Sequence, residues 1–441
     1  NNEYYYEQAA KAAHSLIQGQ LDGGGWNYLI DFGGEESIKE WYNTIGKSAW
    51  RLEEFHHYHG NATFDDGATA GAASYLLRFY LVKEDQKVKY ALDKATNFIL
   101  ESQYYEGSWP QRYPIKNEFY IDGKHDYSTY HTFNDGVIVN NLIFLISSYK
   151  VFNDDKLLDP IYKAMNFFIK SLYSNLQSGW ALQYDLELKP ATARSYEPAS
   201  LDPQLSYRNC EMLLKFYQMT GDEKYLEVIP DVINWIETVT IKKLDNNLIA
   251  VPKFVEVGTN KALYVHRRGE NSYYGEYYVD YETGNDIIHY PSTRYLNLRY
   301  LKNEYERIRL NIIDFVEGRI FIPGLKENSA DQEKLKAISE FFSISQYRRD
   351  RDNSNNKEIV KRIISELDYN GRWLVSEVYI SNPYKGIPEN GNQFPTKYSN
   401  TYVGNEYDSS PYPNDTDSKY ISTATYIRNM KTLVRYLKTL D

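Results

Sequence analysis

The sequence predicts a fold dominated by α-helices, in which helical hairpins form an α/α toroid with short strands and long loops lining a cleft. Apolar residues recur at i, i+3, i+4 and i+7 over most of the first 300 residues, as they do in amphipathic helices. Residues 83–99, 153–169 and 221–236 also align with one another, and their starts lie 70 and 68 residues apart. Such a period is typical of stacked helical hairpins. An open solenoid is the alternative arrangement.

Each hairpin is predicted to begin with a polar motif and to end with a Gly-Trp loop. The motif reads TFDD at 63–66 and TFND at 132–135, directly before a helix. An acidic turn, a second helix and the Gly-Trp loop follow, and the loops contain Trp26, Trp109 and Trp180. Because motifs and loops recur at one phase of the repeat, we expect them to gather at one end of the toroid, around the cleft.

The pattern changes beyond about residue 240. Residues 247–281 alternate and are rich in Val and Tyr, which indicates short strands or ordered loops. Residues 325–360 are highly charged and favour a solvated helical hairpin, and residues 365–380 resemble the Gly-Trp loop. Residues 382–417 are rich in Pro, Gly and Asn and predict a long loop. Residues 419–440 predict an amphipathic helix that closes the ring.

Composition limits the classes of function. With 441 residues, 42% hydrophobic and 25% charged, the chain can bury a large core. A net charge of −10 argues against nucleic acid as a partner, but leaves an anionic polysaccharide open if the cleft is locally basic or carries metal ions. A single cysteine, Cys210, excludes a disulfide framework. No apolar run reaches about 18 residues, so we expect no membrane span.

Two further features of composition bear on function. The 44 tyrosines suit stacking on sugars, although codon bias in an AT-rich genome explains them equally well. The chain opens with NNEYYYEQ, without an initiator Met or an apolar signal segment, and is interpreted as a mature or trimmed form.

Asp65 and Asp135 are the first candidate site residues. We expect them to occupy equivalent places in consecutive hairpins and to project into one cleft. An Asp before a helix is often an N-cap that binds free backbone N–H groups. Two copies with an extra polar neighbour, Asp66 or Asn134, exceed what capping needs. The pair suits either a hard cation such as Ca²⁺ or a general acid and base.

Two further clusters carry charge. Residues 180–201 contain Asp185, Glu187, Arg194 and Glu197, and Arg194 is interpreted either as a bridge to Glu197 or as an Arg that faces the cleft and binds a carboxylate. The basic segment 253–268 is either a surface cluster or a subsite for acidic sugar rings. It contains Lys253, Lys261, His266, Arg267 and Arg268.

Together these segments resemble polysaccharide lyase family 10, the pectate lyases with an α/α-toroid fold, over roughly residues 60–290. Five motifs carry the resemblance in order: TFDDGAT (63–69), GSWPQRYP (107–114), YHTFND (130–135), ARSYEPASL (193–201) and FVEVGTNKALY (254–264). The resemblance implies a single catalytic domain over 1–441, in which a C-terminal extension from about 310 packs on or closes the toroid.

The resemblance also implies an activity: anti-β-elimination on a 4-linked uronate polymer, most simply pectate, with Ca²⁺. Arg194 would be the base and Asp65 and Asp135 would bind Ca²⁺ or support the site. Because a free Arg is protonated, the base role requires nearby positive charge; otherwise Arg194 stabilises the substrate. The substrate-binding residues would be Asn134, Trp109, Arg112, Tyr130, Asp185, Glu197, Lys261, Arg267 and Arg268. A secreted, periplasmic or cell-surface monomer is expected.

The sequence departs from the family pattern in two places. Lys261 stands where the family has Arg, which removes bidentate binding of a carboxylate. The loop 116–129 is about eight residues longer and brings Asp122, Lys124 and His125 near the cleft. Two other functions therefore stay open. One is a toroid glycoside hydrolase in which Asp65 and Asp135 act as acid and base. The other is a glycan-binding relative without activity.

Overall fold

The computed structural model describes residues 3–42, 60–116, 126–174, 176–194, 196–244, 247–268, 276–283, 292–316, 318–326, 328–343, 357–375, 379–380, 412–413 and 419–437. Most of the predicted long loop over 382–417 lies outside the described residues, as do Asp122, Lys124 and His125.

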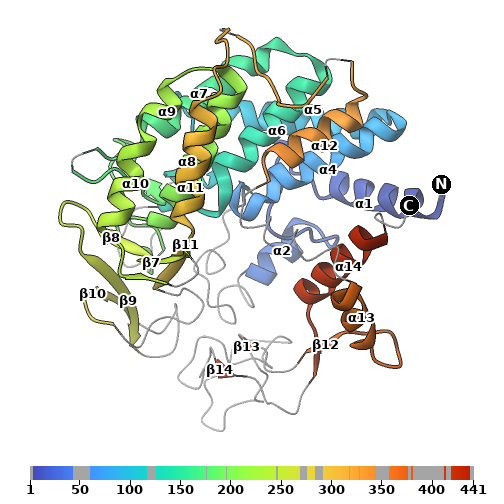
Figure 1. Ribbon diagram of the computed structural model, residues 1–441. Coiled ribbons are helices and arrows are strands. Elements are labelled where there is room, and N and C mark those ends of the chain that lie inside the picture. Colours follow the sequence, from blue (N-terminus) through green and yellow to red (C-terminus); the bar gives the residue numbers. More distant parts are fainter. Residues whose placement is uncertain are drawn as a thin grey trace.

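Three successive helical hairpins form the centre of the molecule (Figure 1). The first pairs α4 (Ala68–Lys83) with α5 (Gln86–Glu101), and the second pairs α6 (Val137–Phe152) with α7 (Leu158–Lys170). The third pairs α8 (Pro203–Thr220) with α10 (Ile229–Thr238), with the short α9 (Lys224–Glu227) between them. In chain order α4 packs on α6, and α7 on α8, so the predicted array of α/α hairpins is confirmed.

The turn inside each hairpin is built in the same way. The first helix ends at a residue in the left-handed conformation: Glu84 (φ 49°), Asn153 (φ 52°) and Gly221 (φ 75°), which lie 69 and 68 residues apart. An aspartate follows each of them, and Asp85 accepts hydrogen bonds from the backbone N–H groups at the start of α5. Asp154 accepts from the backbone N–H of Lys156 in the 3-10 turn before α7, and Asp222 accepts from that of Lys224 at the start of α9. The aspartate thus caps the turn or helix that directly follows it, and only in the first hairpin is that the long second helix.

The tryptophan of each Gly-Trp loop is locked onto the helix that precedes it. Each indole Nε1 donates to a backbone carbonyl 10 or 12 residues upstream. The pairs are Trp26 with Leu16 (2.7 Å), Trp109 with Ile99 (2.7 Å), Trp180 with Phe168 (2.8 Å) and Trp373 with Ile363 (2.7 Å). The last pair confirms that residues 365–380 carry another copy of the loop.

Two of these loops require glycine. Gly24 and Gly107 have φ values of 106° and 104°, and they pass against the backbone of the next hairpin. A Cβ on Gly107 would lie 2.1 Å from the carbonyl oxygen of Lys163, and one on Gly24 would lie 2.4 Å from that of Lys94. Only a residue without a side chain allows this approach, so the glycine sets the spacing of neighbouring hairpins.

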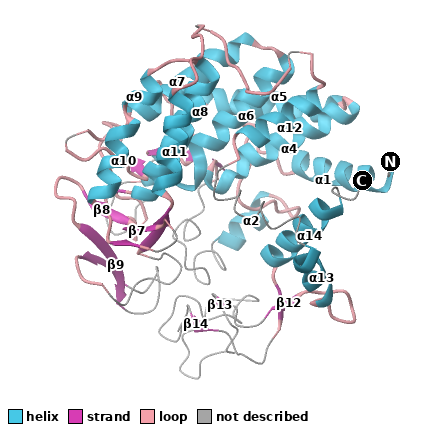
Figure 2. Ribbon diagram, in the orientation of Figure 1, coloured by secondary structure: helices cyan, strands magenta, loops and turns pink. Residues whose placement is uncertain are grey.

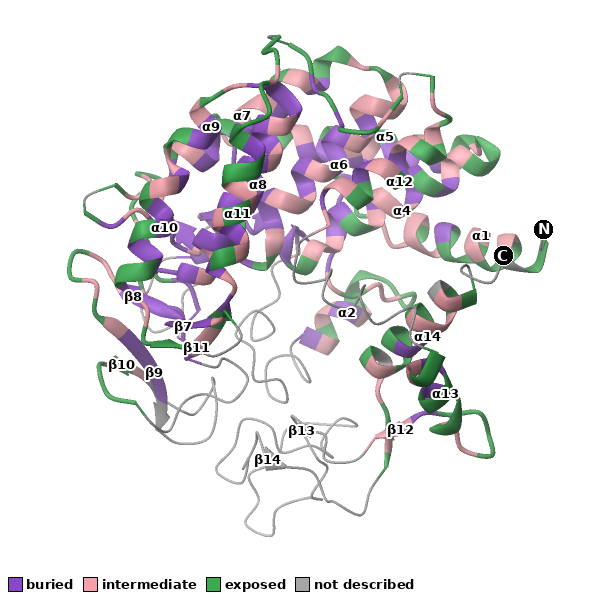
Figure 3. Cartoon of the chain, in the orientation of Figure 1, coloured by how far each residue is buried: buried purple, intermediate pink, exposed green. Residues whose placement is uncertain are grey.

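The main core lies among the first helices of the hairpins and their neighbours, as the buried surface of α6 and α8 shows (Figure 3). The segment Asn134–Phe152 is long and apolar enough to cross a membrane by length and composition alone. It contains α6, which packs on α4, α7 and α12 (Asp331–Phe341). Contact with three other helices explains its apolar composition, because all of them bury surface against it.

Short antiparallel strands occupy the region where the sequence predicted them (Figure 2). One sheet has the order β10 (Glu276–Asp280), β9 (Ala262–Arg268), β8 (Phe254–Glu256) and β5 (Ser200–Leu201). Another has the order β11 (Thr293–Leu296), β7 (Ile249–Pro252) and β6 (Lys242–Lys243).

Four two-residue pairs complete the strands. They are β1 (Ala62–Thr63) with β2 (Arg112–Tyr113), β3 (His131–Thr132) with β4 (Gln183–Tyr184), β12 (Leu374–Val375) with β15 (Tyr420–Ile421) and β13 (Tyr379–Ile380) with β14 (Tyr412–Pro413).

The remaining helices flank the hairpins. α1 (Glu3–Gln18) packs on α4 and α5, α11 (Leu298–Arg309) packs on α8, and α13 (Lys357–Ser365) packs on α14 (Thr423–Leu437). The short α2 (Glu35–Trp41) follows α1 in the chain. The structure confirms the predicted C-terminal helix as α14, and its closing of the ring stays a prediction.

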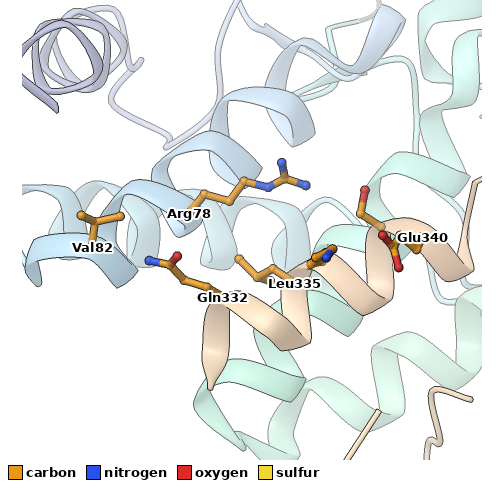
Figure 4. Close-up of a pocket in the computed structure, with 7 residues that line it drawn as sticks. Arg78, Val82, Gln332, Leu335 and Glu340 are labelled. Carbon is orange, nitrogen blue, oxygen red and sulfur yellow. The ribbon is translucent and has the colours of Figure 1, made fainter. Parts of the chain in front are cut away.

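The charged segment 325–360 departs from the expectation of a solvated hairpin. Its first helix, α12, packs on α4 and α6 and buries Leu335 and Ile338. The apolar residues that form this contact, Leu335, Ile338 and Phe342, recur at i, i+3 and i+7, but they stand in a segment otherwise rich in charge. A pocket of about 460 Å³ remains between α4 and α12, with Arg78 on one wall and Glu340 on the other (Figure 4).

Candidate active site

The two polar motifs form matching 3-10 turns, Asp65–Gly67 and Asn134–Gly136, before α4 and α6. Asp66 (φ 50°) and Asp135 (φ 52°) are both left-handed, and each is followed by a left-handed glycine. The structure therefore matches Asp66 with Asp135 and Asp65 with Asn134. The expectation that Asp65 and Asp135 are equivalent is wrong, because the repeat places them one residue out of phase.

Helix capping does not account for these turns. The N-cap residues of α4 and α6 are Gly67 and Gly136, and neither helix start has a side-chain cap hydrogen bond. Capping aspartates occur elsewhere in the chain, at Asp85 of α5 and Asp202 of α8. The acids of the polar motifs are thus available for another role.

Each hairpin begins with a polar motif and ends with a Gly-Trp loop, and backbone hydrogen bonds join the residues just after that loop to the polar motif of the same hairpin. The backbone N–H of Phe64 donates to the carbonyl of Gln111 at 2.9 Å. In the next repeat Phe133 and Asn134 donate to the carbonyl of Leu182 at 2.9 and 3.0 Å. Because Gln111 and Leu182 each follow the second helix of their own hairpin, the repeat itself brings motif and loop to one end.

Arg194 joins the two motifs. Its Nη2 donates to Asp65 Oδ2 at 2.8 Å and to Asp135 Oδ2 at 3.3 Å. Its Nη1 donates to Glu197 Oε2 at 3.2 Å, and Asn134 Nδ2 donates to Glu197 Oε1 at 2.9 Å. Both interpretations of Arg194 thus describe parts of one arrangement: it bridges to Glu197 and also reaches the acids of the motifs. We call Arg194, Asp65, Asp135 and Glu197 the arginine cluster.

Only one member of the arginine cluster has appreciable contact with solvent. The side chains of Asp65, Arg194 and Glu197 are 1%, 5% and 2% exposed, whereas that of Asp135 is 30% exposed. A ligand that enters this end of the hairpins would meet Asp135 first, with the guanidinium of Arg194 directly behind it.

Burial and charge shift the pKa values of Asp65 and Asp135 in opposite directions. Burial acts to raise the pKa of Asp65, but the Arg194 charge and hydrogen bonds from Asp135 and Tyr28 hold that pKa below its ordinary value. Burial and the neighbouring Asp65 charge raise the pKa of Asp135 well above its ordinary value. The pKa values of two carboxyl groups that share one cation move apart in this way. The second carboxylate gains less from attraction to the cation than it loses by repulsion from the first.

The three carboxylates also act on Arg194. Opposite charges at hydrogen-bond distance favour the protonated guanidinium, so the cluster as it stands opposes the loss of a proton from Arg194. If all three acids are ionised, the cluster has two negative charges in excess. Additional positive charge would both balance the cluster and make Arg194 more acidic.

The cluster fits a calcium ion in part. Asp65 Oδ1 is buried and has no hydrogen-bond partner among the described residues, and the carboxylate of Asp135 is partly exposed. Oxygen atoms of this kind are the ligands that Ca²⁺ takes, usually six to eight of them. No group of three or more His, Cys, Asp or Glu side chains in the described ranges is arranged to hold a metal, so a substrate carboxylate and water would complete the coordination.

The first Gly-Trp loop contributes two residues that sequence reasoning missed. The hydroxyl of Tyr28 donates to Asp65 Oδ2. Asn27 Oδ1 accepts from Arg112 Nη2 at 3.1 Å, and the Arg112 guanidinium lies 5.3 Å from the centre of the Tyr28 ring. Their signal was the sequence WNY directly after the first copy of the Gly-Trp motif. Arg112 itself is buried, so it supports Tyr28 rather than facing a cleft.

Trp109 is not available for stacking on a sugar. Its side chain is fully buried, and its indole N–H is bonded to Ile99. The prediction of a substrate contact here is wrong, because the tryptophan packs into the hairpin core instead. Tyr130 is half-buried against Tyr127 and Ala193, next to Arg194 in the chain. Burial, followed by the charge of Asp185, raises the pKa of Tyr130.

Asp185 stabilises its own turn. Its Oδ1 accepts hydrogen bonds from the backbone N–H groups of Glu187 at 3.0 Å and Lys189 at 2.9 Å. This turn lies between β4 and the loop that carries Arg194. Asp185 therefore shapes the approach to the arginine cluster, and its binding of substrate stays a prediction.

The basic segment 253–268 does not form one patch. Lys253 is buried in an ion pair with Asp202 at 2.5 Å, and His266 Nε2 lies 2.9 Å from Asp280 Oδ1. Lys261 is exposed in the turn between β8 and β9, and its Nζ lies 4.8 Å from the centre of the Tyr281 ring. Arg267 and Arg268 belong to β9, and their side chains lie outside the described part of the chain.

Comparisons with known proteins give one family. A family model described as pectic acid lyase matches residues 20–283, more than half of the chain. The search of curated proteins found no match to this chain.

Three solved structures are similar to a smaller degree. A variant of a family 10 polysaccharide lyase from Cellvibrio cellulosa, in complex with trigalacturonic acid, is 18% identical over 69% of this chain and 96% of its own, with a TM-score of 0.47. A second structure of a family 10 polysaccharide lyase from that organism is 20% identical over 59% and 83%, with a TM-score of 0.43. A family 105 glycoside hydrolase from C. acetobutylicum is 12% identical over 99% of both chains, with a TM-score of 0.35.

Proposed function

Because this chain belongs to the pectic acid lyase family and is a polysaccharide lyase, we propose that it cleaves a 4-linked uronate polymer by calcium-assisted β-elimination. The observation that carries the proposal is the arginine cluster, in which one guanidinium reaches acids from two successive polar motifs. The structure of a lyase from the same broad class in complex with trigalacturonic acid supports polygalacturonate as the first polymer to test.

The reaction requires three events at one sugar. The proton on C5 must leave, the electron pair must form the C4–C5 double bond, and the C4–O4 bond must break, with the proton for O4 coming from solvent. Ca²⁺, when bound by Asp135 and Asp65, would neutralise the adjacent carboxylate of the substrate and so make the C5 proton more acidic.

We assign removal of the C5 proton to Arg194. Its guanidinium lies directly behind the partly exposed carboxyl of Asp135 and is fixed by Glu197 on its other side. Glu197 is in turn oriented by Asn134, so a residue from the second motif positions the base. The carboxylates favour the protonated guanidinium, and their charge must be compensated before Arg194 accepts a proton. Dependence on a cation is therefore part of the proposal.

We further propose that Tyr28 positions Asp65, and that Tyr130, Asp185, Lys261, Arg267 and Arg268 contact the polymer around the cluster. We also propose that the enzyme is secreted, periplasmic or on the cell surface, because a polysaccharide does not cross a membrane unaided, and that it acts as a monomer.

The geometry argues against the glycoside hydrolase alternative. Asp65 Oδ2 and Asp135 Oδ2 both contact Arg194 Nη2, at 2.8 and 3.3 Å, so these two oxygens lie no more than about 6.1 Å apart. Inverting hydrolases hold their two carboxyl groups about 6.5–9.5 Å apart and retaining hydrolases about 5–5.5 Å apart, whereas Asp135 hydrogen-bonds directly to Asp65. Asp65 is also fully enclosed, with 1% of its side chain exposed, which leaves it no path to a glycosidic oxygen.

The test is an assay of polygalacturonate with and without added Ca²⁺, followed by the ultraviolet absorbance of the unsaturated product. We expect absorbance to rise with Ca²⁺ and to stop rising on addition of EDTA. A panel of other uronate polymers identifies the substrate. If reducing ends appear without the unsaturated chromophore, cleavage is hydrolytic and the proposal is wrong.

A further inference from the structure

A second pocket lies at the opposite end of the hairpins from the arginine cluster. Its volume is about 520 Å³, and it lies beside the C-terminal end of α6, a helix of 16 residues whose first turn follows the second polar motif. A helix of that length spans about 24 Å. The two sites are therefore separate. We call this the distal pocket, and its residues are Tyr149, Lys150, Val151, Asn153, Arg319, Ile320, Phe321, Ile322, Leu325, Lys326 and Lys334.

One wall of the distal pocket is the segment 318–326, which lies beyond the residues that match the family model. The hydroxyl of Tyr162 in α7 donates to the carbonyl of Arg319 at 2.9 Å, and Lys150 in α6 donates to that of Ile320. The backbone N–H of Phe321 donates to the carbonyl of Met219 in α8 at 2.8 Å. Three helices thus fix this segment in place, and the pocket is a built feature of the fold.

Positive charge gathers in the distal pocket, although the chain as a whole carries a net charge of −10. Four lining residues are cationic, Lys150, Arg319, Lys326 and Lys334, and none of the described lining residues carries a carboxylate. Lys334 is paired with Asp331 at 2.7 Å, and Lys150 donates to a backbone carbonyl. Arg319 and Lys326 are exposed, so they are the cations best placed to meet a ligand.

Aromatic rings stand beside these cations. Phe321 is 41% exposed, and Tyr149 lines the same pocket. Burial, and then the charge of Asp155, raises the pKa of Tyr149, while Arg319 acts to lower it, so Arg319 lies close to the phenol. An exposed ring offers an apolar face to a sugar, and a neighbouring guanidinium offers a planar fork to a carboxylate.

We propose that the distal pocket is a non-catalytic binding site for a uronate segment of a polysaccharide. Phe321 would stack on a sugar ring, and Arg319 and Lys326 would pair with its carboxylates. The choice of uronate over other anions rests on the proposed function. A second site on the far end of the hairpins would keep the enzyme on its polymer between cleavages, because two linked sites raise the effective local concentration.

The pocket between α4 and α12 is a weaker candidate for an anion (Figure 4). Glu340 lies on its wall together with Arg78, so its charge is mixed. It also has no aromatic lining residue among those described. The combination of exposed cations, an exposed ring and a wall fixed by three helices is found in the distal pocket.

The test compares the double variant Arg319→Gln/Lys326→Gln with Lys242→Gln/Lys243→Gln. The control removes the same charge from the exposed strand β6. Retardation of the intact protein in native gels containing polygalacturonate and EDTA measures binding without turnover. We expect the distal variant to bind about tenfold more weakly, as loss of charge-assisted contacts predicts, and the control to match the parent. Cleavage of trigalacturonic acid by the distal variant should match the parent.

Further binding measurements identify the ligand. Phe321→Ala should weaken binding to polygalacturonate and leave binding of inorganic phosphate, measured by calorimetry, unchanged. Equal retardation of the distal variant and the control would overturn the proposal, and so would a pocket that binds phosphate but no uronate. These results are independent of catalysis: binding that depends on Arg319 in a protein without lyase activity refutes the proposed function and leaves the distal site standing.

Discussion

Arg194 is a guanidinium held by three carboxylates, and that balance determines what it can do. Glu197 lies three residues away in the chain, while Asp65 and Asp135 come from two separate hairpins. A buried cation with such partners is costly to remove, because its carboxylates would be left without compensation. The same partners also keep it protonated. Stability and the proposed role as base therefore make opposite demands on Arg194.

Replacing Arg194 with Lys tests the base. Lys keeps the positive charge but lacks the planar fork that reaches Asp65, Asp135 and Glu197 at once. We expect kcat to fall by about 10²-fold or more, the usual contribution of a general base, with a smaller change in KM. Arg194→Ala should in addition lower the free energy of unfolding by about 3–5 kcal/mol. Steady-state kinetics and urea denaturation measure the two effects.

Lys253→Met provides the matched control for that experiment. Lys253 also forms a buried ion pair, with Asp202. Its loss should destabilise the protein to a similar extent and leave kcat of the folded fraction unchanged. An equal loss of kcat in Lys253→Met would mean that activity follows stability, and Arg194 would lose its special role.

Asp135→Asn separates activity from stability. The folded protein holds a proton on Asp135 more tightly than the unfolded chain does, because the pKa is raised in the folded state by burial and by the charge of Asp65. Stability contributed by this group is therefore present at acidic pH and lost as pH rises through the raised pKa. Asn does not titrate, and it tolerates the left-handed backbone at this position.

We accordingly expect Asp135→Asn to raise the free energy of unfolding at neutral pH by roughly 1 kcal/mol, and to abolish lyase activity. Urea denaturation at pH 5 and pH 8 should show the gain mainly at the higher value. Asp93→Asn, which changes an exposed ion pair with Lys89, serves as control and should show no such dependence. Destabilisation of Asp135→Asn at pH 8 would contradict the assigned pKa direction.

At the scale of elements, the Gly-Trp loops determine how closely hairpins pack. Gly107→Ala places a methyl group 2.1 Å from the carbonyl of Lys163 and requires alanine to adopt φ 104°. We expect the free energy of unfolding to fall by more than about 2 kcal/mol, since strain and a backbone clash add.

Gly71→Ala is the control for that substitution. Gly71 lies inside α4 with open space where a Cβ would lie, so alanine should stabilise the helix by about 0.5–1 kcal/mol. Thermal or urea denaturation of both variants gives the two signs. If Gly107→Ala left the free energy of unfolding unchanged, the loop would be able to move away from α7.

The tryptophans of these loops are structural, and Trp109→Phe tests that conclusion. Phe keeps an aromatic ring in the core but removes the indole N–H that donates to the carbonyl of Ile99, which keeps Ser102 Oγ as a donor at 3.2 Å. The smaller ring and the lost hydrogen bond together should lower the free energy of unfolding by about 1–3 kcal/mol. KM for uronate oligomers should not change. A rise in KM without loss of stability would restore the sugar-stacking role that the sequence suggested.

The repeat made the hairpins predictable from sequence, because a period near 70 residues relates buried positions, turns and caps in register. The direction of individual side chains was not predictable in the same way. Trp109 and Tyr28 both belong to Gly-Trp loops, yet the first is enclosed in the core and the second bonds to Asp65. The phase of the polar motifs, in contrast, is present in the sequence: both end in Asp-Gly, so an alignment without gaps pairs Asp66 with Asp135 and Asp65 with Asn134.

At the scale of the whole molecule, the repeats give the bundle two ends that differ in composition. The polar motifs and Gly-Trp loops converge at the end that carries the arginine cluster. The opposite end is closed in part by the segment 318–326 and by α12, neither of which falls within the match to the family. The chain after the family region thus adds new surface to a shared scaffold, and α12 shows that this addition is packed into the core.

Removal of calcium tests how the ion relates to the fold. The described residues supply two carboxylates at the cluster and no group of three, so Ca²⁺ alone should bind weakly and leave the thermal unfolding transition unchanged. With a uronate oligomer present, the substrate carboxylate completes the coordination. The midpoint temperature of unfolding should then rise. The free energy of unfolding should increase by about 2.7 kcal/mol when the ligand is at 100 times its dissociation constant.

EDTA should abolish both the rise and the lyase activity, while the ligand-free protein unfolds at the same temperature with or without EDTA. Differential scanning calorimetry with each of the four combinations of Ca²⁺ and oligomer distinguishes the cases. Asp135→Asn should lose the joint effect, whereas Arg319→Gln/Lys326→Gln should keep it, because the latter acts at the distal pocket. A large stabilisation by Ca²⁺ alone would mean that the protein provides a complete site, and the shared coordination by enzyme and substrate would be wrong.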